Sequence, residues 1–452
     1  MMTASTPLIV TFVVYLVAMV LIGVAAWRST KNFDDYILGG RKLGPGVTAL
    51  SAGASDMSGW LLMGLPGALY LRGASEAWIA LGLIGGAYLN WRFVAGPLRV
   101  YTERTGNALT LPDFFTHRFE DRSRLLRVIS ALVILVFFAV YCASGVVAGA
   151  RLFESVFGLP YAQALWWGAA VTILYTLIGG FLAVSWTDVA QGTLMLFALL
   201  LTPVIVYMTT GGFESSIELI RSVDAARLSW TREGALGLVG IVSLLAWGLG
   251  YFGQPHILAR FMAAGSVETI PAARRIGMAW MILCLAGSLT VGFLGIAYFQ
   301  QHPEQAGPVV ANSERVFITL VELLFNPWVA GVILSAIFFM RKVGKTLIVA
   351  EIPTPEPGAL RYRVSGQLFF ASAELFAAGF EHHGRPERVE IDMSDAHLWD
   401  LTGVAALDKV VFRYRRQGAV VEVTGLNAAA SVLVDRLGRF EKNHLPSQAG
   451  AH

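Results

Sequence analysis

The sequence predicts an all-α membrane bundle of about nine transmembrane helices, followed by a small soluble α/β domain. Of the 452 residues, 55% are hydrophobic and only 14% are charged, and the mean hydropathy is +0.60. This composition is typical of a membrane protein. After about residue 340 the long apolar runs give way to short alternating segments. We therefore expect a membrane domain over residues 1–340, a soluble domain over residues 345–442 and a disordered tail over residues 443–452.

Nine apolar runs are long enough to cross a bilayer as helices. They lie near residues 7–27, 45–71, 76–98, 126–150, 163–185, 188–209, 235–257, 276–298 and 318–340. Lys and Arg concentrate after the first, third, seventh and ninth runs. Because these residues favour the cytoplasmic side, the N-terminus is expected outside and the soluble domain inside.

The second apolar run carries a charge among helix-loosening residues in the stretch SAGASDMSGW, residues 51–60. At the bilayer centre, Asp56 would cost about 2.5–3.5 kcal/mol on insertion scales. Loosened backbone at membrane depth persists only where protein buries it or where it lines a cavity. The stretch therefore predicts a discontinuous helix whose carboxylate and freed carbonyls meet a cation. The alternative is a helix-packing face of small residues.

The seventh run is also interrupted, by the stretch WGLGYFGQP at residues 247–255. It lies five spans after the first interruption, and an offset of five spans inverts the topology. Two broken spans at matching positions in two halves point to a transporter binding site between inverted repeats. The alternative is that Gly and Pro are simply common in membrane helices.

Several other classes of protein are not favoured by this sequence. The net charge of +3 is too small to indicate a nucleic-acid partner. No GxSxG elbow or P-loop is present, so we do not expect an enzyme. Cys142 and Cys284 lie in apolar runs and are interpreted as buried small side chains. No cofactor is expected beyond a coupling ion.

With these residues considered, residues 5–337 resemble the sodium/solute symporter family, in particular its proline-transporting bacterial members. The motifs that carry the resemblance are NFDDYILGGR (32–41), residues 51–60, ALTLPDF (108–114), IGGFLAVSWTD (178–188) and GYFGQPHILAR (250–260). The resemblance implies a five-plus-five inverted-repeat core in the bacterial inner membrane, with sodium flow driving proline uptake. Arg41 and Asp188 match family positions, and each alone would be interpreted as an interfacial charge.

The resemblance also implies two sets of site residues. The sodium set consists of the backbone carbonyls of Ala54 and Met57, with Asp56, Ser58 and Gly59 shaping the site beside them. The proline set consists of Trp60, Tyr141, Trp247, Tyr251, Gln254 and Pro255. Unwound carbonyls suit a hard cation, and an aromatic box suits an apolar ring with a small zwitterionic end. For Tyr141 and Trp247, ordinary packing is the alternative.

The last part of the chain alternates predicted strands (347–352, 360–364, 388–392, 419–423) with predicted helices (371–380, 404–415, 428–437). Residues 338–442 resemble the cytoplasmic STAS domain of SulP-type sulfate permeases, which is related to anti-sigma-factor antagonists. The motifs are VEIDMS (389–394), DLTGVAALDKV (400–410) and VVEVTGLN (420–427). The resemblance implies a cytosolic protein partner and a phosphorylation site at Thr402. The alternative for Asp400 and Thr402 is a plain helix cap.

The two resemblances meet inside the ninth span. In the symporter family this span continues into a Ser-Thr pair that completes the sodium site, whereas Val343 and Gly344 stand here. The last two helices of the second repeat are also expected to be missing, so the core is a truncated one. We therefore expect a symporter fused to a regulatory domain, with defective proline transport. The alternatives are a membrane-anchored STAS scaffold and, less favoured, a relative of sulfate or anion permeases.

Overall fold

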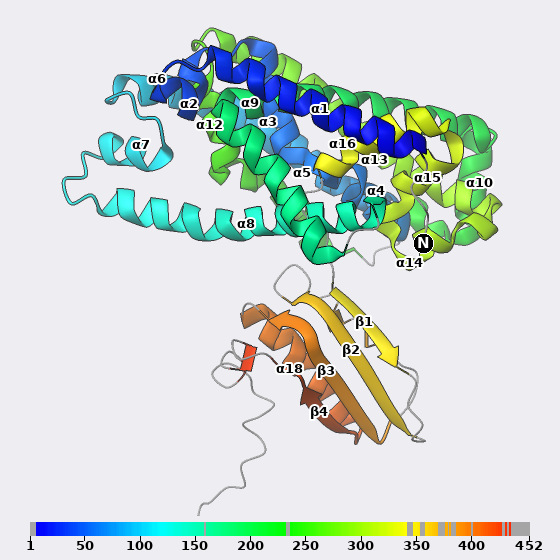
Figure 1. Ribbon diagram of the computed structural model, residues 1–452. Coiled ribbons are helices and arrows are strands. Elements are labelled where there is room, and N and C mark those ends of the chain that lie inside the picture. Colours follow the sequence, from blue (N-terminus) through cyan, green and yellow to red (C-terminus); the bar gives the residue numbers. More distant parts are fainter. Residues whose placement is uncertain are drawn as a thin grey trace, which may run out of the picture. The chain divides into compact units, whose positions relative to one another are not determined.

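Figure 1 shows the computed structural model of the chain. It describes residues 6–157, 160–231, 236–340, 347–352, 358–368, 376–377, 379–380, 386–398, 401–426, 430–431 and 434. The chain separates into two compact units, Met1–Val343 and Gly344–His452. The first unit is helical and the second contains a four-stranded sheet.

The helices of the first unit pack around α3 (Pro45–Met57), which contacts α9, α12 and α13. The other helices are α1 (Thr6–Ser29), α2 (Phe33–Leu38), α4 (Gly64–Arg72), α5 (Ala77–Leu89), α6 (Ala95–Arg104), α7 (Leu111–Arg118), α8 (Leu125–Phe157), α9 (Tyr161–Thr209), α10 (Phe213–Val223), α11 (Leu238–Leu245), α12 (Pro255–Ala263), α13 (Thr269–Gln301), α14 (Gly307–Ala311), α15 (Val316–Leu324) and α16 (Pro327–Met340). Figure 1 shows α1 lying along α16 and α9.

Within the described residues, four helical segments are long and apolar enough to cross a membrane. They are Thr6–Ser29, Leu125–Ala143, Thr176–Thr209 and Thr269–Gln301. The pair Leu238–Gly253 and Pro255–Ala263, bent by 48°, makes a fifth if it counts as one span. The remaining predicted spans fall in shorter or interrupted helices, such as α3 and α4.

Two predicted helix boundaries differ from the structure. The fifth and sixth runs are expected to separate near residue 186, but α9 is kinked earlier, at Gly180 (φ 57°, ψ −146°). Only glycine adopts this conformation readily, and the ring of Tyr36 occupies the place where a Cβ would lie. The predicted ninth span, 318–340, is two helices, since α15 ends at Leu324 and α16 begins at Pro327. Because proline is favoured in the first turn of a helix, a new helix begins at Pro327.

The second unit is a mixed sheet in the order β1-β2-β3-β4. Its strands are β1 (Leu347–Ile352), β2 (Ala359–Leu368), β3 (Arg388–Leu398) and β4 (Val420–Thr424), and α18 (Leu401–Arg416) follows β3. β1 and β2 are antiparallel, whereas β2, β3 and β4 are parallel. Alternate residues Val389, Ile391 and Met393 are fully buried, while the opposite face carries charges.

All four predicted strands and the central helix are found, with β2 and β3 longer than expected. Of the predicted helices over 371–380 and 428–437, only residues 376–377, 379–380, 430–431 and 434 are described. Residues 376–377, 430–431 and 434 are helical. The tail at 443–452 lies outside the described residues.

Candidate functional site

The first predicted interruption is observed where α3 ends. Met57 closes the α-helix, and Ser58 takes a left-handed φ of 47° before a short 3-10 segment, η2 (Ser58–Leu62), which contains Gly59. A non-glycine residue at such an angle costs about 1–3 kcal/mol and persists only where its surroundings enforce it. The Ser58 amide donates to the Ala54 carbonyl.

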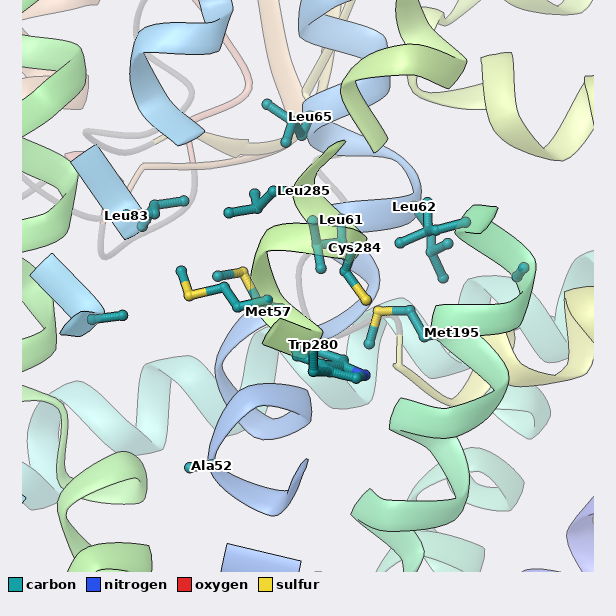
Figure 2. Close-up of a cluster of buried hydrophobic side chains, with 14 of the residues drawn as sticks. Ala52, Met57, Leu61, Leu62, Leu65, Leu83, Met195, Trp280, Cys284 and Leu285 are labelled. Atoms are coloured by element: carbon teal, nitrogen blue, oxygen red, sulfur yellow. The ribbon is translucent and has the colours of Figure 1, made fainter. Parts of the chain in front are cut away.

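The break in α3 is held by tightly packed apolar side chains. Figure 2 shows Met57 close to Trp280 and Cys284 of α13. Trp280 fills the notch at Gly53, where a Cβ would lie 2.7 Å from the indole ring. The indole nitrogen also donates to the carbonyl of Gly192 in α9, at 2.9 Å. The packing therefore fixes the last turns of α3, just before its break, between α9 and α13.

The second interruption is observed between α11 and α12. Its middle is a 3-10 segment, η6 (Ala246–Gly253), and α12 begins with Pro255 directly after the extended residue Gln254. Tyr251 is buried, whereas Trp247 is 56% exposed. The break bends the helix axis by 48°.

The two interruptions meet through two pairs of side chains. The Tyr251 hydroxyl donates to Asp56 Oδ2 at 2.5 Å. The Trp60 and Trp247 rings stack with their centroids 6.1 Å apart and an interplanar angle of 18°. Asp56, Trp60, Trp247 and Tyr251, four of the predicted site residues, are therefore brought together. Asp56 and Tyr251 are 195 positions apart in the sequence.

Tyr141, in α8, packs against the start of α12 and is not part of the tryptophan stack. Its ring stacks on His256, with centroids 5.9 Å apart and an interplanar angle of 14°. Phe138 contacts the same imidazole. His256 is absent from the predicted set, although it follows Pro255 directly in the motif. Gln254 is partly buried, and its Oε1 has no hydrogen-bond partner among the described residues.

Asn90 is a site residue that sequence reasoning missed. It begins a π-helical segment, η4 (Asn90–Val94), between α5 and α6, and it is 1% exposed. Its Nδ2 donates to the backbone carbonyl of Tyr251 at 3.0 Å. Such π-helical segments frequently occur at functional sites. The only signal in the sequence is one amide side chain inside an apolar run.

A narrow cavity of about 20 Å³ lies beside these residues. Asp56, Asn90 and Tyr251 line it, together with apolar side chains of α3, α5, α12 and α13. Ligand pockets for small organic molecules are typically about 300–1,000 Å³. This cavity is therefore of the size of a water molecule or an ion.

A second polar cluster lies on the adjacent face of α3. Asp188, expected as an interfacial charge, is buried, and its Oδ2 accepts hydrogen bonds from Ser51 (2.7 Å) and Ser55 (2.8 Å). Arg260 of α12 donates to the same oxygen at 2.9 Å and to Ser51 Oγ at 3.0 Å. In the sequence, Arg260 stands out only as one of the positive charges after the seventh run and as the last residue of the motif 250–260, because nothing there links it to Asp188.

Arg41 was also expected to be interfacial, and it binds the C-terminal end of α12. Its guanidinium donates to the carbonyls of Met262 (2.7 Å) and Ala108 (2.8 Å). Buried Arg99 donates to Ala264 and Gly265 nearby. Two arginines therefore hold the C-terminal carbonyls of the second broken span.

The side chains of four further predicted positions lie outside the described residues. Thr402 is the second residue of α18, and its side chain lies outside the described residues, as does Asp400. Val343 and Gly344 also lie outside them. Among the described residues, no group of three or more His, Cys, Asp or Glu side chains could hold a metal ion.

Binding sites formed by discontinuous helices, such as the two that meet here at the partly buried carboxylate of Asp56, are characteristic of membrane transporters. A family model for the sodium:solute symporter family matches residues 36–343, and one for the STAS domain matches residues 352–449. The chain therefore belongs to the sodium:solute symporter family, and it carries a STAS domain after the membrane unit.

The chain is similar to proline transporters of known bacteria. It is 68% identical over 336 residues to the sodium/proline symporter of Escherichia coli strain K12, covering 74% of this chain and 66% of that protein. It is 51% identical to the high-affinity proline transporter PutP of Bacillus subtilis strain 168, covering 74% and 70% of the two chains. The chain thus spans about two thirds of the length of these relatives.

The fold of the membrane unit is also found in a solved structure. A sodium-coupled sialic acid symporter in a substrate-bound, outward-open state superimposes with a TM-score of 0.64. The two chains are 20% identical, and the match covers 75% of this chain and 71% of the other. This likeness establishes a mostly helical membrane transporter fold.

Proposed function

We propose that the membrane unit carries out sodium-coupled uptake of proline. The hydrogen bond from Tyr251 to Asp56 carries this proposal, because it joins the two broken spans at an intramembrane carboxylate. An ionisable residue within a span is a marker of an ion or substrate pathway. The relatives named above, at 51–68% identity, support sodium and proline as the transported species.

Each predicted site residue has a role in this proposal. The carbonyls of Ala54 and Met57 would bind sodium, and Asp56, Ser58 and Gly59 would shape that site. The tryptophan stack would contact the apolar ring of proline, since aromatic faces suit such a ligand. The full proline set is Trp60, Tyr141, Trp247, Tyr251, Gln254 and Pro255.

The surroundings of the site are proposed as well. A truncated core of the five-plus-five type, with about nine spans and an incomplete second repeat, occupies residues 1–340 in the bacterial inner membrane, with the N-terminus outside. The STAS domain, residues 345–442, is cytoplasmic and binds a cytosolic protein, with Thr402 as its phosphorylation site. Because Val343 and Gly344 replace a hydroxyl pair, each missing ligand removes a contact of about 1.5–3 kcal/mol, and we expect weak transport.

Uptake of labelled proline into vesicles tests this function. We expect uptake that requires an inward sodium gradient and is lost in Asp56→Asn, while Glu304→Gln, which neutralises an exposed carboxylate, transports as the unaltered chain does. A chain present in the membrane that takes up no proline with or without sodium would refute the proposal.

A second candidate function is a membrane-anchored STAS regulator. The STAS match over residues 352–449 favours it, as does the loss of the hydroxyl pair. This candidate predicts saturable binding of a cytosolic protein to the full chain in membranes, unchanged by Asp56→Asn. The symporter match of residues 36–343 argues against the anion-permease alternative.

A further inference from the structure

The π-helical segment η4 has an inner face that packs on the second broken span. It continues α5 and leads directly into α6. Asn90, its first residue, is buried and donates to the backbone carbonyl of Tyr251 in η6. The next residue, Trp91, packs on Phe261 of α12, with ring centroids 4.4 Å apart. Whatever holds η4 in place therefore also supports the two halves of that span.

The outer face of the same segment carries an arginine, and a second arginine lies beside it. The Arg92 guanidinium is 5.4 Å from the centroid of the Phe93 ring, and that of Arg274, in α13, is 5.7 Å from the centroid of the Tyr88 ring. Because Tyr88 lies one turn before Arg92, both arginines border the same stretch of surface. In the described part of the chain, neither guanidinium forms an ion pair with a carboxylate.

The surface that leads to the two arginines is apolar and exposed. Leu81, Tyr88 and Leu89 are 46%, 47% and 44% exposed, and their spacing of seven or eight residues places them on one face of α5. This face continues to Arg92. From Leu81 to Arg92 the helix rises about 16 Å, which is about half of the roughly 30 Å hydrocarbon core of a bilayer. The stripe therefore has the length of one leaflet.

An apolar stripe that ends at two uncompensated arginines fits an anionic phospholipid. Guanidinium groups bind phosphate oxygens with two parallel hydrogen bonds, and they remain charged at all physiological pH values. Basic sites between membrane helices on the cytoplasmic side bind anionic headgroups. A soluble anion would occupy the arginines and leave the stripe uncovered. A neutral lipid would cover the stripe and leave the arginines without a net negative charge.

We propose that Arg92 and Arg274 bind the phosphate of an anionic phospholipid, whose acyl chain lies along Leu81 and Leu89. The bound lipid holds η4 from outside the bundle, while Asn90 joins η4 to the second broken span from inside. The inference goes beyond the proposed function, and it uses the proposed orientation only to assign the lipid to the cytoplasmic leaflet.

Binding of defined lipids to the purified full chain tests the site. Phosphatidylglycerol and phosphatidylcholine with identical acyl chains are titrated into the chain in detergent, and native mass spectrometry counts the bound molecules. The unaltered chain should bind phosphatidylglycerol more tightly. Arg92→Gln and Arg274→Gln should each weaken this binding by about fivefold, because each removes one positive charge near the headgroup, and should leave phosphatidylcholine binding unchanged.

Three controls separate this site from general charge effects. Arg221→Gln removes an equally exposed arginine from the last turn of α10, on the proposed outer side, and should bind phosphatidylglycerol as the unaltered chain does. Arg92→Lys retains the charge and should retain most of the binding. Phosphatidylglycerol should raise the thermal midpoint by mass action, whereas potassium phosphate should raise it no more than potassium chloride of equal ionic strength.

Hydrogen exchange tests the connection from the lipid to the broken span. Phosphatidylglycerol should slow the exchange of the η4 and η6 amides, and the double variant Arg92→Gln/Arg274→Gln should lose this protection. Unchanged exchange in η4 and η6 on lipid binding would refute the connection to the broken span.

Several outcomes would overturn the site. They are equal affinity of the unaltered chain for the two lipids, undiminished phosphatidylglycerol binding in the double variant, and an equal loss in Arg221→Gln. Stabilisation by potassium phosphate alone would identify the ligand as a soluble anion. A lower midpoint in the double variant with undiminished lipid affinity would give the arginines a structural role only. None of these measurements requires transport, so a chain that takes up no proline can still confirm the site.

Discussion

The carboxylate of Asp56, in α3, and that of Asp188, in α9 against a neighbouring face of α3, have contrasting surroundings. Asp188 of α9 is buried with an arginine at 2.9 Å and two serine hydroxyls within 2.8 Å. Asp56 of α3 has one tyrosine hydroxyl and an adjoining cavity. The arginine lies in α12, nine residues after the tyrosine, so the same broken span provides both partners.

This difference distinguishes a charge that stabilises the fold, Asp188, from one that is free to bind a ligand, Asp56. A buried ion pair that also has hydrogen bonds to its remaining positions is costly to break but offers little to a ligand. A carboxylate left without a cation gains by binding one. The two clusters therefore predict opposite responses to neutralisation, and the variants below test this contrast.

The largest effect on stability is expected for Arg260→Gln. It leaves Asp188 buried and unpaired, and breaking such a pair typically costs about 3–5 kcal/mol. The thermal midpoint of the purified chain should fall by many degrees, whatever the sodium concentration. The double variant Asp188→Asn/Arg260→Gln should recover part of the loss, because neither remaining group is charged. If Arg260→Gln were as stable as the unaltered chain, the ion pair between Arg260 and Asp188 would not stabilise the fold.

Asp56→Asn should have a smaller effect on stability. The amide oxygen can still accept from Tyr251, and the uncompensated charge is removed, so the midpoint without sodium should stay within about 1 kcal/mol of its original value or rise. The stabilisation by sodium should disappear. Melting curves with and without sodium check both points. A loss of stability equal to that of Arg260→Gln would erase the distinction between the two carboxylates.

A third carboxylate, Asp392 of β3, extends the comparison to a soluble setting. The hydrogen bonds from Ser394 and the nearby guanidinium of Arg363 lower the pKa of Asp392. A lowered pKa stabilises the fold above the unfolded value of about 3.9, and this stability is lost as the pH falls through the folded value.

Asp392→Asn should therefore weaken the second unit at pH 7, by about 1 kcal/mol because Arg363 is half exposed, and its effect should shrink steadily as the pH falls below about 3.9. Hydrogen exchange of the β3 and β4 amides in the full chain measures this, with exposed Asp395→Asn as the control. Equal protection of Asp392→Asn and the unaltered chain at pH 7 would contradict the prediction.

Much of the architecture could be predicted from composition and spacing. Asp56 inside an apolar run indicated the first break, and the Gly- and Pro-rich stretch before Pro255 indicated the second. All four strands of the second unit followed from alternating patterns. These features are local, because they depend on what one segment can bury or on which backbone angles it can adopt.

The partners of the polar groups could not be predicted in this way. Arg260 appeared as one positive charge among several, and Asn90 as one amide in an apolar helix. Their roles depend on contacts over 72 residues to Asp188 and 161 residues to Tyr251. No periodicity within a helix encodes such distances.

The sequence by itself determined that this chain crosses a membrane, that two of its spans are broken, and that a small α/β domain follows. Hydrophobic length, turn residues and alternation fix these features locally. Only the tertiary structure decided which carboxylate is neutralised by an arginine and which faces a cavity. Charges inside the bundle are stabilised by whichever groups the packing of α3, α9 and α12 brings within hydrogen-bond distance.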